Sequence, residues 1–329
     1  MLRSFSRLAI LFFFPLVGLI NQLAGAQSTP APARTSLAKT PKSTPFRIVA
    51  YLPDYRLQTL VPAQLDHVTD LIFFSIAPTA EGDLDLQRCT PEALTKLHTL
   101  TRGRALRLTI AVGGWARGDG FAPMIANPKA REHFIQTLTQ FCHTNKFAGA
   151  DFDWEGPQNA VQQAGYGTLM QEVKRRFVAE GLHLSIAQAS WEKLPQVGLE
   201  AVDEIHIMAY DHDGQHATPA QAQEDIAAFI KKGVPKKKLF LGLPFYGRDI
   251  HDRNKEMTYA DIVQRFHPAA ETDMAGDFYF NNVRTIVLKT KAAQQDGLGG
   301  VMIWELGQDT TNETSLLQAI AHASGKTAK

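Results

Sequence analysis

Three acidic side chains recur at every second position within one short segment of the chain. Asp151, Asp153 and Glu155 alternate there with Phe152 and Trp154. Because successive side chains of a β-strand point to opposite faces, the three acids would share one face, roughly 6–7 Å apart at each step. The two aromatic side chains would share the other face, toward the covering helices. Carboxyl groups stacked in this way are suited to acid–base chemistry.

Crowding predicts that at least one of these carboxyls keeps its proton near neutral pH, because neighbouring like charges raise its pKa. Glu155 comes last along the segment, and we expect it to be the acid. Two other interpretations fit the pattern: the wet face of a surface strand, or ligands for Mg²⁺ or Ca²⁺. Apolar neighbours argue against the first. No second cluster of ligands in the sequence supports the second, so we expect neither a metal nor a cofactor.

Eight short apolar runs supply the strands that would position these acids. They alternate with amphipathic stretches, several of which begin with an N-cap residue followed by proline, as at Thr90-Pro91, Asn127-Pro128 and Thr218-Pro219. Little charge lies inside the runs, which is typical of parallel strands buried on both faces. The eight runs are 47–52, 67–76, 106–112, 149–154, 182–187, 204–209, 238–243 and 299–304.

This alternation predicts an α/β fold, a (β/α)8 TIM barrel, over an open doubly wound sheet. The open sheet usually carries a glycine loop after its first strand, whereas Pro53-Asp54-Tyr55 follows here. Segment 249–298 is longer than one crossover helix needs. We expect a short insertion between strands seven and eight, with an extra helix at 257–266, an excursion over the rim at 273–280 and the crossover helix at 282–295.

The N-terminus has the features of a secretory signal peptide. Arg3 and Arg7 precede an uncharged apolar run at 8–20, and the small residues 24–26 offer a cleavage site. The run is shorter than a spanning helix requires, which disfavours an uncleaved membrane anchor. We expect a signal peptide at 1–26, a disordered linker at 27–45 rich in Ser, Thr, Pro and Ala, and the barrel at 46–329. The mature protein would be secreted or periplasmic, without a membrane contact.

The balance of charged residues gives no reason to expect a nucleic-acid partner. Lys and Arg number 34 against 33 Asp and Glu, so no basic excess points to nucleic acid or to an acidic membrane. The only two cysteines are Cys89 and Cys142. The first precedes a helix and the second lies near the end of the next one, so in a parallel barrel they would face opposite rims. We therefore expect free thiols.

The acidic segment resembles the catalytic strand of glycoside hydrolase family 18, the chitinases and their relatives. That pattern is Asp-Gly-x-Asp-x-Asp-x-Glu; the chain matches the glycine at Gly149 and the last three acids, but Ala148 replaces the first. This departure affects the tuning of the acids more than the activity. Four further segments resemble the family in the same order, so that the resemblance covers about 47–308. They are Val112-Gly113-Gly114-Trp115, Met208-Ala209-Tyr210-Asp211, Gly242-Leu243-Pro244-Phe245-Tyr246-Gly247-Arg248 and Gly299-Gly300-Val301-Met302-Ile303-Trp304-Glu305.

The resemblance implies a substrate-assisted mechanism. Glu155 would protonate the leaving oxygen, and the acetamide of the substrate would attack the anomeric carbon. Asp153 would hold the acetamide N–H, and Asp151 would share a proton with Asp153 and control its charge. Tyr210 would hold the acetamide oxygen. Further residues implied in substrate binding are Trp304 as an apolar floor, Asp211 orienting the sugar or Tyr210, Met208, and Tyr246 and Arg248 in neighbouring subsites.

Trp115 and Trp191 could stack on sugars or could equally pack under loops. The expected function is retaining hydrolysis of β-1,4 bonds at N-acetylglucosamine in chitin or chitooligosaccharides, by a monomer. An endo-β-N-acetylglucosaminidase acting on N-glycans or peptidoglycan is the alternative, and a short insertion that leaves a shallow groove would suit it. A non-catalytic glycan-binding protein is a third, which the presence of Glu155 disfavours.

Overall fold

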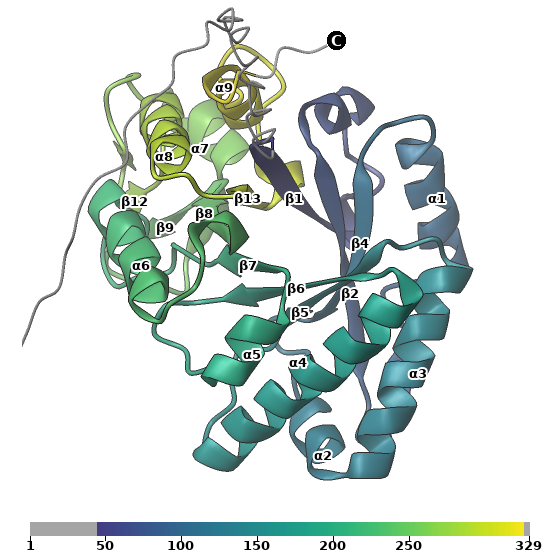
Figure 1. The fold of residues 1–329 in the computed structure, drawn as a ribbon. Coiled ribbons are helices and arrows are strands. Elements are labelled where there is room, and N and C mark those ends of the chain that lie inside the picture. The colour runs from purple at the N-terminus through teal and green to yellow at the C-terminus, as the bar shows by residue number, and fades with distance from the viewer. Residues whose placement is uncertain (1–44, 326–329) are drawn as a thin grey trace, which may run out of the picture. The chain divides into compact units, whose positions relative to one another are not determined.

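Eight parallel strands close into a ring in the computed structural model, which describes residues 45–325. β1 pairs in parallel with both β2 and β13, so the ring has no free edge. Helices lie around the outside of the strands (Figure 1). The ring strands are β1 (Arg47–Pro53), β2 (Asp70–Pro78), β4 (Arg107–Gly113), β5 (Gly149–Asp153), β6 (His183–Gln188), β7 (Glu204–Ile207), β8 (Leu239–Pro244) and β13 (Gly300–Trp304). The predicted TIM barrel is confirmed.

The helices begin where the sequence places their caps. The side chains of Thr90, Asn127 and Thr218 each accept a hydrogen bond from the first turn, and proline follows each of them. The helices are α1 (Pro91–Thr101), α2 (Phe121–Ala126), α3 (Pro128–Thr144), α4 (Ala160–Glu180), α5 (Gln196–Ala201), α6 (Pro219–Lys231), α8 (Val283–Gln295) and α9 (Leu316–Ala323), with 3₁₀ turns η1 (Asp54–Arg56), η2 (Pro62–His67), η3 (Lys236–Lys238) and η4 (Leu306–Gln308).

Two apolar clusters hold the barrel together. The larger one lies between strands and helices, where Phe152 of β5 packs among helix residues such as Phe134. The smaller cluster lies inside the ring and is rich in aromatic residues, including Tyr51, Tyr210 and Tyr246. Packing on both faces explains why the strand runs carry so little charge.

The segment between β8 and β13 forms a small α+β unit. β9 (Tyr246–Asp249) pairs antiparallel with β10 (Glu256–Thr258) and with β12 (Phe278–Tyr279), which also pairs with β11 (Met274–Ala275). α7 (Tyr259–Phe266) follows β10 directly. The expected extra helix and crossover helix are present, and the excursion at 273–280 is a two-stranded hairpin of this sheet.

Several bounds differ from the sequence-based ones. β2 begins at Asp70 rather than at 67, because η2 occupies the preceding residues, and β7 ends at Ile207 rather than at 209. A short strand, β3 (Leu84–Asp85), pairs antiparallel with β2 and was not expected. Cys89 and Cys142 are both buried and free, as predicted.

The expected signal peptide and nearly all of the expected linker lie outside the described residues. Across 45–325, none of the helices combines the length and apolarity that a membrane crossing requires.

Candidate active site

The acids of β5 face the inside of the barrel. Asp151 is fully buried and Asp153 is 4% exposed. On the opposite face, Phe152 contacts Phe121 and Phe134, and Trp154 stacks on Phe121 at 5.0 Å between ring centroids. This arrangement confirms the predicted two faces and excludes a wet surface strand.

Asp151 is surrounded by hydrogen-bond donors from three other strands. Its Oδ2 accepts from the Tyr51 hydroxyl at 2.5 Å, and its Oδ1 accepts from Ser185 at 2.5 Å. Nδ1 of His206 lies 2.8 Å from the same Oδ1. Side chains of this chain therefore occupy both oxygens. Among the described residues, no group of three or more acids, histidines or cysteines is arranged so that it could hold a metal ion.

Asp153 lies one pleat above Asp151, where burial and neighbouring carboxyl groups disfavour its charged form. Burial, followed by the charges of Glu155 and Asp151, raises its pKa well above the usual range. Within the described residues its Oδ1 is buried without a hydrogen-bond partner. The backbone of Asp153 is held against the end of β4, because Gly114 N donates a hydrogen bond to the Asp153 carbonyl oxygen at 2.7 Å. Burial and the neighbouring charges therefore favour the protonated form of Asp153, whose Oδ1 is free to bind a ligand.

Glu155 lies two residues beyond the end of β5, not on the strand itself. Its side chain is exposed and lines a hollow of about 470 Å³ between the loops after β4 and β5. Loss of solvation and the charge of Asp211 raise the pKa of Glu155, while Arg248 opposes this. A carboxyl of raised pKa open to the rim can protonate a bound ligand.

The inner aromatic cluster brings Tyr210 and Trp304 together above the acids. Tyr210 is 5% exposed, and its hydroxyl lies 3.9 Å from the sulfur of Met302. Burial and the nearby carboxylates raise its pKa well above 10, so it remains a donor. Trp304, half-buried at the end of β13, meets Tyr51 and Phe74 edge-on at 5.4 and 4.9 Å. Met208 packs against the same cluster.

Asp211 is held by the two residues expected to line neighbouring subsites. Its carboxylate accepts from the Tyr246 hydroxyl at 2.6 Å and from Arg248 Nε and Nη2 at 2.5 and 2.9 Å. Burial alone would raise the pKa of Asp211, but His216, Arg248 and Tyr246 hold it below its usual range. Asp211 is thus a fixed anion beside Glu155.

Two large aromatic side chains are exposed on the rim. Trp115 is 80% exposed and lines the hollow beside Glu155, and Trp191 is 53% exposed. Trp191 meets the ring of His212 edge-on at 4.9 Å. His212 Nε2 and Ser190 Oγ both contact Asp225, at 2.9 and 2.5 Å. Neither tryptophan is buried under a loop.

The model of glycosyl hydrolases family 18 matches residues 47–309. The chain belongs to this family. Among curated relatives, it is 27% identical over 278 residues to probable chitinase 10 of Drosophila melanogaster, covering 63% of this chain and 12% of the relative. It is 26% identical over 274 residues to chitinase 1 of Aphanocladium album, covering 66% of this chain and 65% of the relative. The family-18 chain thus spans less than two thirds of either relative's length.

Solved structures share the fold of this family-18 chain. A chitinase, ChiB, from the chitin utilization locus of Flavobacterium johnsoniae superposes with a TM-score of 0.78 at 26% identity, covering 86% of this chain and 94% of that one. A chitinase of Cycas revoluta, solved in complex with (GlcNAc)3, superposes at 0.71 with 21% identity, covering 85% and 99%.

Sequence reasoning missed four polar side chains of this family-18 site. Tyr51, Ser185 and His206 bind Asp151, and the pKa of Glu192 is raised to about 7 by burial and by Glu155. The available signal was a polar residue inside an apolar strand run, as for Ser185 on β6 and His206 on β7. Such a residue needs a buried partner, but the pattern of one strand does not identify it.

Proposed function

We propose that this chain hydrolyses β-1,4 bonds at N-acetylglucosamine in chitin or chitooligosaccharides, with retention of configuration. The observation that carries the proposal is the column of carboxyls at the barrel mouth. Glu155 and Asp153 both have raised pKa values, and they lie above the buried, fully bonded Asp151. Family membership and the chitinase names of the relatives support the same reaction.

In the first step, Glu155 donates its proton to the glycosidic oxygen as the bond to the anomeric carbon breaks. The acetamide oxygen of the same sugar attacks that carbon and forms a cyclic oxazolinium ion. The Tyr210 hydroxyl donates to the acetamide oxygen and aligns it for attack. The free oxygen of Asp153 accepts the acetamide N–H and steadies the positive charge.

In the second step, Glu155 acts as a base. It removes a proton from water, the water oxygen attacks the anomeric carbon, and the carbon–oxygen bond to the acetamide breaks. Two inversions at one carbon give retention. No carboxylate of the enzyme needs to attack the sugar, which accounts for a column of acids on one strand rather than a pair across the ring.

Aromatic side chains supply binding to the apolar faces of sugar rings. Trp304 lies in the inner cluster as a floor beneath the reacting sugar. Trp115 and Trp191 come from the loops after β4 and β6, on either side of the strand that leads to Glu155. They would stack on neighbouring sugars, because rigid exposed aromatic rings bind with little loss of conformational freedom.

The relatives with chitinase names favour chitin over N-glycans or peptidoglycan, and Glu155 together with Tyr210 favours an enzyme over a glycan-binding protein. We further propose that the barrel acts as a monomer after export. The export proposal depends on the signal-like residues 3–26.

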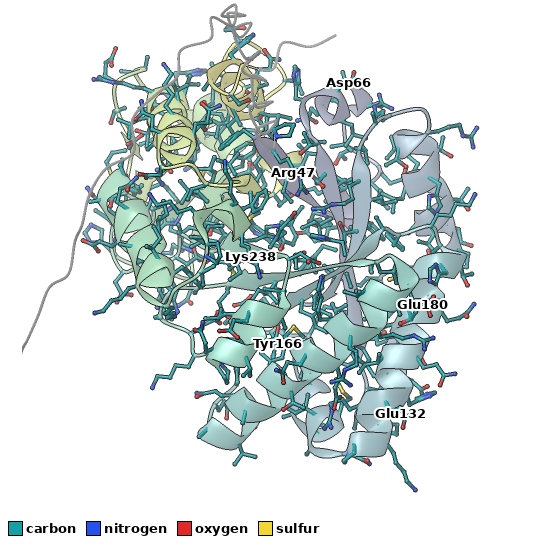
Figure 2. All side chains as sticks on the ribbon, viewed as in Figure 1. Arg47, Asp66, Glu132, Tyr166, Glu180 and Lys238 are labelled. Atoms are coloured by element: carbon teal, nitrogen blue, oxygen red, sulfur yellow. The ribbon has the colours of Figure 1, made fainter. Side chains whose placement is uncertain are left out.

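The decisive variant is Glu155→Gln. We expect at least a 1,000-fold loss of kcat on chitooligosaccharides, because the amide cannot donate the proton, with an unchanged circular dichroism spectrum. Glu132→Gln is the matched control, since Glu132 is an exposed residue of the outer helix α3 (Figure 2) and does not line the hollow beside Glu155. Near-normal turnover by Glu155→Gln would contradict the proposed role. The wild-type panel should include peptidoglycan and N-glycans, with products identified by mass.

Substrate assistance has its own test. A thiazoline analogue of N-acetylglucosamine mimics the oxazolinium ring and should inhibit competitively. NMR of the first product should show the β-anomer before mutarotation. Indifference to the analogue, or an initial α-anomer, would exclude the acetamide as the nucleophile.

A further inference from the structure

The leaving part of the substrate must cross one particular side of the barrel rim. β13, which carries Trp304, and β5, which leads to Glu155, stand opposite one another in the ring of eight strands. A sugar chain with its reacting ring over Trp304 and its scissile oxygen at Glu155 therefore runs across the mouth. Beyond Glu155 it meets the loops that follow β4, β5 and β6. Trp115 and Trp191 stand on the first and the third of these loops.

Trp191 lies in a tight turn directly after β6. Glu192 N donates to the Ala189 carbonyl at 3.2 Å, and Ala189 N donates to the Glu192 carboxyl group at 2.8 Å, so the turn is closed by two hydrogen bonds. The side chain of Trp191 is nevertheless exposed. A flat aromatic ring on a fixed backbone can bind the apolar face of a sugar with little loss of conformational freedom.

A buried acid of α6 holds both sides of this turn. Asp225 is 2% exposed. Its Oδ1 accepts from the Ser190 hydroxyl at 2.5 Å, and its Oδ2 lies 2.9 Å from Nε2 of His212. Ser190 directly precedes Trp191, and its carbonyl also accepts from Lys232 Nζ at 3.3 Å. Within the part of the chain that the structure describes, the carboxyl group of Asp225 bonds to these two rim side chains alone.

His212 connects this anchor to the indole ring. The rings of His212 and Trp191 meet edge-on, with 4.9 Å between centroids and 74° between planes. Asp residues are rarely buried unless they are paired, and both partners of Asp225 belong to the rim rather than to the core. The buried carboxyl group therefore orders the rim around Trp191.

We propose that Asp225 and His212 are positioning residues that hold Trp191 as the platform for a sugar on the leaving-group side, so that the enzyme selects chains that extend beyond the scissile bond. This inference rests on the proposed function and deepens it. The ligand of the platform is the apolar face of an N-acetylglucosamine ring in the leaving part of the chain. A substrate whose leaving group is not a sugar gains nothing from it.

The test compares two substrates that differ only beyond the scissile bond. Chitotetraose that is cleaved to two disaccharides has sugars there, whereas the 4-nitrophenyl glycoside of chitobiose has a nitrophenol. In His212→Ala, the ratio of kcat/KM for chitotetraose to kcat/KM for the aryl glycoside should fall about tenfold, the size expected for one aromatic contact. The fall should appear in the KM of chitotetraose more than in its kcat. Trp191→Ala should show at least the same fall.

The matched control is His133→Ala. His133 also pairs with an acid, since its Nε2 lies 2.7 Å from Asp83, but it is exposed on the outer helix α3. This variant should keep the wild-type ratio. In a Trp191→Ala background, His212→Ala should lower the ratio by less than about twofold more, because a positioning residue acts through the residue that it positions. Additive losses, or an unchanged ratio in a folded and active His212→Ala variant, would overturn the proposal.

A binding measurement covers the case in which these variants do not fold. In Glu155→Gln, which should bind the substrate without cleaving it, the indole N–H resonance of Trp191 should shift as chitotetraose is added. Comparison with Trp191→Phe assigns the resonance. Bound chitotetraose that leaves it in place would overturn the proposal. Turnover by the wild type separates the two questions: inactive wild-type protein refutes the proposed function, whereas active protein with an unmoved Trp191 resonance refutes only this inference.

Discussion

At the scale of single residues, protonation in this site depends on the neighbours of each acid more than on its type. Asp151 has three donors and Asp153 has a free oxygen, although the two residues lie one pleat apart on the same strand. A fourth acid, Glu192, lies just after β6, where it accepts from Ala189 N at 2.8 Å and from Gln188 at 2.6 Å. Its charge bears on Asp153 and Glu155 from outside the column.

Glu192→Gln should move the alkaline limb of kcat/KM to lower pH. The pKa of Glu192 is raised to about 7, so the side chain is an anion above neutral pH. Its negative charge then raises the pKa of Asp153 and so opposes loss of a proton from that carboxyl. The neutral amide removes this opposition, and the shift should be about one pH unit or less. The measurement is a pH profile on a soluble oligosaccharide; an upward shift or no shift would contradict this role of Glu192.

At the scale of elements, the position of Asp153 is set by a close approach between β4 and β5. Gly113 has a φ of +101°, and a Cβ there would lie 2.3 Å from the Asp153 carbonyl oxygen. The glycine pair at the end of β4 therefore allows Gly114 N to bond that same oxygen. No other residue type fits this backbone without moving the acid.

Gly113→Ala should lower the free energy of unfolding by about 3 kcal/mol or more, because strain in φ adds to a backbone clash. Gly103→Ala is the matched control. Gly103 has a φ of +76° but nothing within 4 Å of an added Cβ, so it should cost only about 1–2 kcal/mol. Urea unfolding measures both. Equal losses in the two variants would show that the contact with Asp153 carries no energy.

The length of an element decided whether it could be predicted from the sequence. The eight ring strands were predictable because each is an apolar run long enough to recognise, and Asp151, Asp153, Tyr210 and Trp304 were predictable from their motifs. The sheet of β9 to β12 was not, since strands of two to four residues have no measurable periodicity. Nor was the contact of His206 with Asp151, which depends on the register of strands across the ring.

At the scale of the whole molecule, the buried amine of Lys289 connects the insertion to the barrel. Lys289 of α8 is 1% exposed, and its Nζ donates to the Ala217 carbonyl at 2.6 Å and to Asn281 Oδ1 at 2.7 Å. Ala217 precedes α6, and Asn281 follows β12. Two segments far apart in the chain therefore meet at one amine, which burial makes difficult to charge.

Lys289→Met should remove a pH dependence of stability. Burial lowers the pKa of Lys289 to about 7, against roughly 10.4 in an unfolded chain. Between these values the unfolded chain binds a proton that the folded protein lacks, so this group makes stability rise with pH by up to about 1.4 kcal/mol per unit. Denaturation at pH 7.5, 8.5 and 9.5 should show this rise in wild type and in the exposed control Lys291→Met. Parallel curves for Lys289→Met and wild type would contradict the assignment.

The two cysteines have a practical consequence for anyone handling this barrel. Both thiols are buried, and burial raises each pKa to about 12, so neither is a nucleophile in the native state. Reductants can be present throughout purification without loosening a cross-link. An alkylating dye would react only with molecules in which local or global unfolding has exposed a thiol. The rate of labelling at Cys89 and Cys142 would therefore measure how often the barrel unfolds around each of them.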